Sequence, residues 1–221
     1  MRQLTLLANK YGTDKGTVFR EQHGYTEIYE DFLKQYIGKH PRILEIGVEN
    51  GDSLKMWNDF FVGDCEIYAI DIEPEKIKYQ TNNTHIFIFD QSSRIDWEAF
   101  KSKLENNGEN FFDIIIEDGS HMPEHQIITL YELSNSVKKD NGIYILEDLH
   151  TNIEKKWYFL NGIEMSDTPL FSLIFFEKSK FLTDEENEYL YSKIKNINIY
   201  SLDNEFSQFK NRSITGIINF K

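Results

Sequence analysis

The sequence is poor in cysteine, in positive charge and in long apolar runs. Its single cysteine, Cys65, allows no internal disulfide and predicts a cytoplasmic protein. No apolar run reaches the roughly 20 residues that span a bilayer, so no membrane insertion is expected. The 24 basic residues face 37 acidic ones, and the resulting net charge of −13 repels phosphate backbones. Nucleic acids are therefore not expected as partners.

Short apolar segments alternate with segments of helical spacing. Five of the apolar segments are rich in β-branched or aromatic residues, which is typical of strands buried on both faces of a parallel sheet. The alternation predicts one α/β domain, 1–221, with a doubly wound, mostly parallel, Rossmann-like sheet of seven strands that ends in an antiparallel hairpin. The predicted strands are 42–47, 66–71, 85–90, 112–118, 142–148, 197–202 and 213–220, and the predicted helices are 25–37, 53–61, 75–79, 95–105, 124–137 and 183–195.

Residues 151–180 follow no clear pattern. Their length suits a lid or an acceptor-binding insertion. The composition leaves the oligomeric state open, a homo-oligomer included.

Each of the first five predicted strands has a carboxylate at or near its C-terminal end. Turns favour aspartate through bonds to nearby amides, and this explains any single case. Five cases in a row are different, because like charges on one edge repel unless a cation lies among them. The residues are Glu45, Asp71, Asp90, Asp118 and the pair Glu147–Asp148.

The first strand leads into a glycine-containing turn, 45–51 (EIGVENG), in which Gly47 and Gly51 allow a ligand close to the backbone. With Asp71 at the end of the next strand, the pattern favours a nucleoside whose ribose is bound by a carboxylate. Asp90 and Gln91 would then contact the adenine edge. Because the pyrophosphate fingerprint G-x-G-x-x-G is absent, the pattern indicates S-adenosylmethionine rather than NAD.

The fourth and fifth strands are expected to be neighbours, which would bring Asp118, Glu147 and Asp148 together. Converging carboxylates have raised pKa values unless a divalent cation neutralises them. Oxygen ligands favour a hard ion, so the sequence predicts Mg²⁺ at this place. The alternative is a solvated acidic rim without a metal.

His121 follows Asp118 in the string DGSHMPEH and is the candidate general base, since a neutral imidazole accepts a proton near physiological pH. The alternative is a polar residue at the start of a helix. The H-x-x-E-H pattern of His121 and His125 also matches inverted zinc peptidases. Pro123 fits only the first helical turn, so the two histidines should diverge. His23, His125 and His150 are secondary candidates.

Six strings, read together, carry a resemblance to a known family. The sequence resembles the metal-dependent sugar O-methyltransferases of macrolide tailoring, the mycinamicin-type 2″-O-methyltransferases and their rhamnosyl-methylating relatives, over about residues 8–152. These enzymes have the class I methyltransferase fold. The strings are YGTDKGT (11–17), HGYTEIYEDFL (23–33), LEIGVENGDSLKMW (44–57), DQSS (90–93), EDGSH (117–121) and ILEDLHT (145–151).

The resemblance implies roles for residues of this sequence. It implies that Asp118, Glu147 and Asp148 bind Mg²⁺, and that His121 is the general base. It also implies that residues 1–38 cover the cofactor and the acceptor. The cofactor contacts that it implies, together with those expected above, are Thr13, Glu45, Gly47, Gly51, Ser53, Asp71, Asp90, Gln91 and Asp118.

The sequence thus predicts an S-adenosylmethionine- and Mg²⁺-dependent O-methyltransferase that acts on a sugar hydroxyl of a small-molecule or glycan acceptor. Two alternatives belong to other classes. One is a nicotinamide-dependent sugar oxidoreductase on the same type of sheet, and the other is a catalytically silent nucleoside-binding subunit. The clustered carboxylates argue against the silent subunit, because without a ligand their mutual repulsion serves no purpose.

Overall fold

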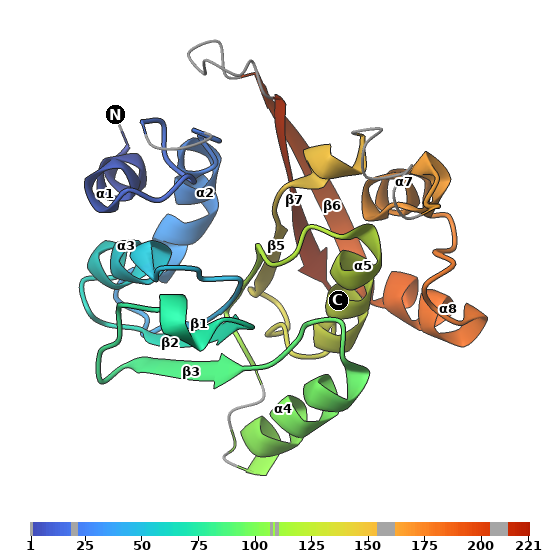
Figure 1. Ribbon diagram of the computed structural model, residues 1–221, viewed down its shortest axis with the longest axis horizontal. Helices are drawn as coiled ribbons and strands as arrows, with labels where there is room; N and C mark the ends of the chain where they lie inside the picture. Colours follow the sequence, from blue (N-terminus) through green and yellow to red (C-terminus); the bar gives the residue numbers. More distant parts are fainter. Residues whose placement is uncertain (1, 19–21, 107, 109–110, 154–161, 204–211) are drawn as a thin grey trace.

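The computed structural model describes residues 2–18, 22–106, 108, 111–153, 162–203 and 212–221. Within these ranges seven strands form one sheet in the order β3-β2-β1-β4-β5-β7-β6 (Figure 1). Strands β1 to β5 are parallel, and β7 is antiparallel to both β5 and β6. The predicted mostly parallel sheet with a C-terminal hairpin is confirmed. The strands are β1 Arg42–Ile46, β2 Glu66–Asp71, β3 Thr84–Ile88, β4 Ile114–Glu117, β5 Ile143–Leu146, β6 Ile194–Asp203 and β7 Arg212–Phe220.

Helices cover both faces of the sheet. One layer contains the N-terminal helices and the helix after β1, and the other contains the helices that follow β3, β4 and β5 (Figure 1). The helices are α1 Gln3–Tyr11, α2 Thr26–Leu33, α3 Asp52–Phe60, α4 Arg94–Asn106, α5 Pro123–Leu133, α7 Pro169–Phe175 and α8 Asp184–Lys193, with short 3₁₀ helices η1 Lys34–Tyr36, η2 Pro74–Lys76, η3 Leu149–Asn152 and η4 Met165–Asp167.

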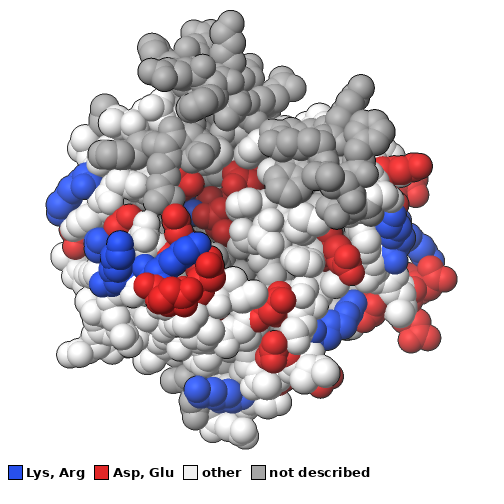
Figure 2. Space-filling model, viewed as in Figure 1, with Lys and Arg blue, Asp and Glu red and all other residues white. Residues whose placement is uncertain are grey.

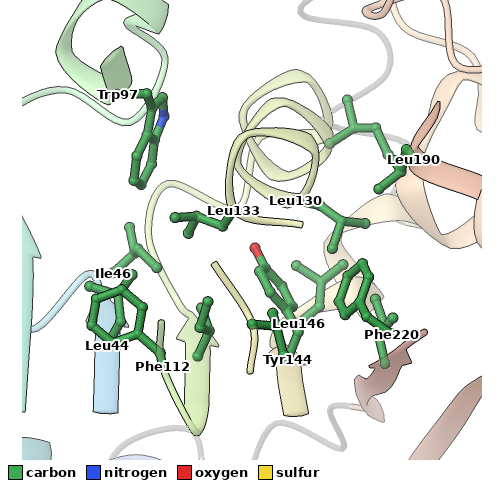
Figure 3. Close-up of a cluster of buried hydrophobic side chains, with 14 of the residues drawn as sticks. Leu44, Ile46, Trp97, Phe112, Leu130, Leu133, Tyr144, Leu146, Leu190 and Phe220 are labelled. Atoms are coloured by element: carbon green, nitrogen blue, oxygen red, sulfur yellow. The ribbon is translucent and has the colours of Figure 1, made fainter. Parts of the chain in front are cut away.

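Alternation along each strand divides the core into two parts. On β5, Ile143 and Ile145 belong to the cluster that includes α1, α2 and α3. Tyr144 and Leu146 belong to the opposite cluster with α4, α5, α7 and α8, and Figure 3 shows them near Leu130 of α5. Because successive side chains point to opposite faces and both faces are buried, the parallel strands are apolar at nearly every position.

Some helices differ from their predicted bounds. The predicted helix 75–79 is wrong: η2 ends at Lys76, and the backbone N–H of Lys78 donates to Asn50 O at 3.1 Å, which holds this segment against the turn after β1. The predicted helix 25–37 is α2 followed by η1, and the predicted helix 124–137 ends at Leu133. The sequence prediction lacks α1, whose end is marked by Gly12 with φ 82°.

The predicted lid or insertion at 151–180 is described in part. Residues 154–161 of this segment lie outside the described residues, and the remainder contains η4 and α7. Its role therefore stays a prediction. None of the helices in the described ranges is both long enough and apolar enough to cross a membrane.

Tyr144 and Tyr29 allow a matched test of what a buried hydroxyl contributes. Both side chains are fully buried, but Tyr29 Oη shares a 2.8 Å hydrogen bond with Thr215 Oγ1, whereas Tyr144 Oη has no partner among the described residues. Removing a satisfied hydroxyl costs about 1 kcal/mol, while removing an unsatisfied one costs nothing or stabilises. We expect Y29F to unfold at a lower urea concentration than the wild type and Y144F at the same or a higher one. An equal loss in both variants would mean that the Tyr144 hydroxyl is satisfied.

Candidate active site

A cavity of about 450 Å³ lies at the C-terminal ends of β1 to β4, the edge at which parallel α/β sheets bind ligands. Its walls come from the turn after β1, the ends of β2 and β3, the segment 118–121 and the loop 12–15. Most of the predicted site residues on this edge line it. They are Thr13, Gly47, Ser53, Asp71, Asp90, Gln91, Asp118 and His121.

The turn after β1 packs directly against the end of β4. Gly47 has φ 81°, and a Cβ at this position would lie 2.0 Å from the backbone oxygen of Asp118. Asp71 fastens the same turn, because its Oδ2 accepts hydrogen bonds of 2.9 Å from the backbone N–H groups of Val48 and Glu49. Its Oδ1 accepts from a third backbone N–H at 2.9 Å. A carboxylate has about four acceptor positions, so Asp71 retains little capacity for a ligand beyond its role in the turn.

The segment after β3 is fixed to the segment after β4. Gln91 Nε2 donates to Glu117 Oε1 at 2.8 Å, and Gln91 Oε1 accepts from the backbone N–H of Ser120 at 2.7 Å. Both the nitrogen and the oxygen of the Gln91 amide therefore already have hydrogen-bond partners within the protein. Asp90 Oδ1 accepts from the backbone N–H of Ser92 at 2.9 Å, and this hydrogen bond lowers the pKa of Asp90.

Two of the predicted cofactor residues, Glu45 and Gly51, are not among the residues that line the cavity. Glu45 lies two positions after Ile43 and shares its face of β1, which α3 covers. It accepts hydrogen bonds from Ser53 Oγ at 2.8 Å and from Trp57 Nε1 at 3.0 Å, and burial raises its pKa. Gly51, with φ 81°, precedes α3. The predicted contacts of Glu45 and Gly51 with the cofactor stay predictions.

Lys15 lies among three carboxylates at the edge of the sheet. Its Nζ is 2.9 Å from Glu147 Oε2 and 3.5 Å from Glu45 Oε1, and it also donates to Asp118 Oδ2. The residue is 1% exposed. Burial alone would lower the pKa of Lys15, but Asp118, Glu147 and Glu45 together hold that pKa well above its ordinary value. In Figure 2 acidic side chains are visible inside a hollow near the centre of the face shown.

Asp148 is surrounded by a tyrosine and three histidines. Tyr25 Oη donates to Asp148 Oδ1 at 2.7 Å, and His23 Nε2 and His150 Nδ1 lie 3.8 Å and 3.7 Å from the same oxygen. His121 Nε2 lies 3.3 Å from Asp148 Oδ2. Burial alone would raise the pKa of Asp148, but the histidines outweigh it and lower the pKa.

His121 occupies the turn between β4 and α5 with φ 57°, a backbone conformation that costs a non-glycine residue about 1–2 kcal/mol. Pro123 begins α5, so His121 lies before the helix and His125 on it, as the proline predicts. Burial alone would lower the pKa of His121, but Asp148 and Asp118 raise it above its ordinary value.

The acidic group fits a hard divalent cation. Glu147 Oε1 is buried and has no hydrogen-bond partner among the described residues, while Oε2 is held by Lys15. Asp118, His121 and Asp148 each offer one ligand atom, and these atoms all lie within 4.8 Å of one another. A cation would satisfy a buried carboxylate oxygen that otherwise lacks a partner. The residues that can share one ion are thus the predicted ligands Asp118 and Asp148 together with His121. The third predicted ligand, Glu147, lies outside this group and is joined to Asp118 through Lys15.

Sequence reasoning misses the two donors that hold these carboxylates, Lys15 and Tyr25. Both lie in strings that carry the family resemblance, but their partners are more than 100 residues away along the chain, at separations of 103, 132 and 123. The acidic strand ends do give one indication of a lysine such as Lys15. An excess of buried carboxylates requires a cation, and a lysine of the protein can supply it as well as a metal can.

The chain is similar in sequence to curated sugar O-methyltransferases. It is 29% identical over 169 residues to 8-demethyl-8-alpha-L-rhamnosyl tetracenomycin-C 2′-O-methyltransferase of Streptomyces olivaceus, a match that covers 73% of this chain and 41% of that protein. It is 32% identical over 155 residues to mycinamicin VI 2″-O-methyltransferase of Micromonospora griseorubida, which covers 67% of this chain and 36% of that protein. The chain therefore spans less than half the length of these relatives. No family model matches it.

A solved structure has the same fold. The MycE methyltransferase from the mycinamycin biosynthetic pathway, in complex with Mg, SAH and mycinamycin VI, matches with a TM-score of 0.74 and 23% identity, over 99% of this chain and 54% of that one. This likeness shows the class I methyltransferase fold, and the curated relatives identify the group. The chain belongs to the sugar O-methyltransferase family that includes the macrolide and rhamnosyl O-methyltransferases.

Proposed function

We propose that this chain transfers a methyl group from S-adenosylmethionine to a sugar hydroxyl of a glycosylated small molecule or glycan, with Mg²⁺ as its metal. One observation carries the proposal: the cavity at the strand ends includes Asp118 and His121, which together with the buried Asp148 also form the candidate metal group. A space for a nucleoside thus adjoins a group suited to a cation, with a histidine shared by both. A methyl donor and an activated hydroxyl must meet in such an arrangement.

The cofactor half of the site is proposed at the ends of β1, β2 and β3. The backbone at Gly47 would contact the cofactor from the cavity wall, Asp71 would contact the ribose through the one acceptor position that its three backbone hydrogen bonds leave, and Asp90 would contact the adenine edge. Support comes from their common position on the cavity wall and from the hydrogen bonds that fix the turn. The acidic surroundings also favour a positively charged sulfonium.

The metal half is proposed at Asp118, Glu147 and Asp148. When bound, the ion would lower the pKa of the acceptor hydroxyl. The chain itself keeps these carboxylates away from water and oriented, since Glu147 is 1% exposed and Asp148 accepts from Tyr25. The unpartnered Glu147 Oε1 supports this set.

His121 is proposed as the general base. As the hydroxyl oxygen bonds to the methyl carbon, the sulfur–methyl bond of the donor breaks and the hydroxyl proton passes to His121. Asp148, whose Oδ2 lies 3.3 Å from His121 Nε2, would stabilise the resulting imidazolium. The His121 side chain lines the cavity, and its Nδ1 has no hydrogen-bond partner among the described residues, which supports a role in accepting a proton.

The acceptor is proposed as a class. The relatives are named for methylating a rhamnosyl tetracenomycin and mycinamicin VI, and the solved relative holds mycinamycin VI. A sugar on a small molecule is the chemistry that these names share. Residues 151–180 are proposed to contribute the acceptor-binding insertion.

Replacement of His121 tests the base. We expect H121A to lower turnover by about 10²–10⁴-fold while the affinity for S-adenosylhomocysteine stays within a few-fold of the wild type. H85A is the control, because His85 is a partly exposed residue of β3 whose Nε2 bonds Glu66. In H121A the turnover should fall while the affinity for S-adenosylhomocysteine, measured by calorimetry, stays near that of the wild type. In H85A both quantities should stay near those of the wild type. Wild-type turnover in H121A would exclude His121 as the base.

Removal of the metal tests the acidic group. Treatment with EDTA should abolish methyl transfer, and added Mg²⁺ should restore it. Titration of the metal-free protein with Mn²⁺, followed by electron paramagnetic resonance, should show one bound ion that D148N weakens. Activity that is indifferent to EDTA would instead support a solvated acidic rim without a metal.

Cofactor choice separates this proposal from a nicotinamide-dependent oxidoreductase. A ligand at a thousand times its Kd stabilises a protein by about 4 kcal/mol, which raises the melting temperature by several degrees. We expect S-adenosylhomocysteine to produce such a rise in a thermal-shift assay, and NAD to produce none. The reverse result would favour the oxidoreductase.

A further inference from the structure

Lys15 is a buried cation that the proposed mechanism does not use. It comes from the loop after α1 and reaches the sheet edge, where its ammonium contacts Glu45, Asp118 and Glu147. Burying an ammonium is costly unless ion pairs and hydrogen bonds compensate. Hydrophobic residues of the same volume would fill this space at less cost. The location of the charge therefore calls for an explanation beyond packing.

The contacts of Lys15 are selective for particular oxygen atoms. On Asp118 the ammonium binds Oδ2, and on Glu147 it binds Oε2 at 2.9 Å. Glu147 Oε1 stays buried and has no hydrogen-bond partner among the described residues. Lys15 thus fixes one oxygen of the Glu147 carboxylate, and this contact sets the orientation of the carboxylate group. The other oxygen, Oε1, does not contact the lysine.

Tyr25 likewise contacts only one oxygen of Asp148. Its hydroxyl binds Oδ1 at 2.7 Å, while Oδ2 lies on the side of His121, 3.3 Å from Nε2. A neutral donor therefore orients Asp148, and a cationic donor orients Asp118 and Glu147. The positive charge lies where three carboxylates approach one ammonium.

We propose that Lys15 is a positioning residue of the metal site, which holds one oxygen each of Asp118 and Glu147 so that the opposite oxygens bind the ion. This proposal rests on the proposed Mg²⁺ site. Lys15 remains in place when the ion binds, so the centre contains two cations, one from the protein and one from solution. Donors that orient ligating carboxylates typically contribute about 10–100-fold to metal affinity.

A charge-balanced variant isolates orientation from charge. K15M alone removes a positive charge next to the ion, so it changes the charge of the site as well as the orientation of the carboxylates. K15M/E45Q removes one charge of each sign and leaves Asp118, Glu147 and Asp148 intact. Glu45 is not a proposed ligand, so E45Q is the matched single control. K10M is a second control, because Lys10 is an exposed lysine of α1 that pairs with Asp59.

The measurement is Mn²⁺ affinity by electron paramagnetic resonance, with S-adenosylhomocysteine affinity and the urea midpoint recorded in parallel. We expect K15M/E45Q to bind Mn²⁺ at least about 10-fold more weakly than the wild type, and E45Q and K10M to stay within about 3-fold. Cofactor affinity should change little in K10M, and it should be the same in K15M/E45Q as in E45Q, because Glu45 is itself a predicted cofactor contact. A double variant that binds Mn²⁺ as the wild type does overturns the role of Lys15 and leaves the proposed function intact. A wild type that binds no Mn²⁺ overturns both.

A second measurement uses the unaltered protein, in case the double variant does not fold. In protein labelled with ¹⁵N-lysine, a buried, ion-paired ammonium exchanges slowly with water and gives a resolved NMR signal. We expect the Lys15 signal to shift on addition of Mg²⁺ and to remain protected. Loss of the signal on Mg²⁺ binding would mean that the ion displaces the ammonium, and that Lys15 substitutes for the metal rather than positioning its ligands.

Discussion

The ion pairs of Lys15 with Glu45, Asp118 and Glu147 hold together the sheet edge at which the candidate site lies. Carboxylates that share a buried edge repel one another, and burial penalises their charged forms further. One ammonium, closed off from solvent, contacts three of them. Without it, the carboxylates would take up protons or the edge would open to water, and neither state offers anionic ligands in a fixed arrangement.

The other carboxylates of the edge are stabilised by hydrogen bonds from neutral donors. Glu117 ends β4 on the face opposite Lys15, and there Gln91 donates to it. Asp71 at the end of β2 and Asp90 after β3 accept hydrogen bonds from backbone N–H groups of the turns that they stabilise. Acidic residues can thus occur in both the proposed cofactor half and the proposed metal half of the site. Side-chain alternation along the strands and the local turns give each carboxylate its own hydrogen-bond or ion-pair partners.

The sheet could be predicted from the sequence because its signals are local. Continuous apolar runs mark strands that are buried on both faces, and the place of Asp118 and Glu147 at neighbouring strand ends follows from the parallel order. The direction of Glu45 could not be predicted, because a shift of one residue along a strand reverses the face that a side chain occupies. The helix expected at 75–79 fails for a similar reason, since the contact of Lys78 with Asn50 is invisible to periodicity.

Lys15 and Tyr25 escaped prediction because their partners are distant in the chain. The bonds from Lys15 to Glu147 and from Tyr25 to Asp148 span 132 and 123 residues. In addition β7, the last strand in sequence, inserts between β5 and β6. Such contacts form only after the entropy of closing long loops has been overcome, which makes them late events in folding. During synthesis, a chain that has reached β4 already carries Lys15 and Asp118, but it has neither Glu147 nor the strand that closes the sheet. The candidate site is therefore assembled only once the long-range contacts of Lys15 and Tyr25 have formed.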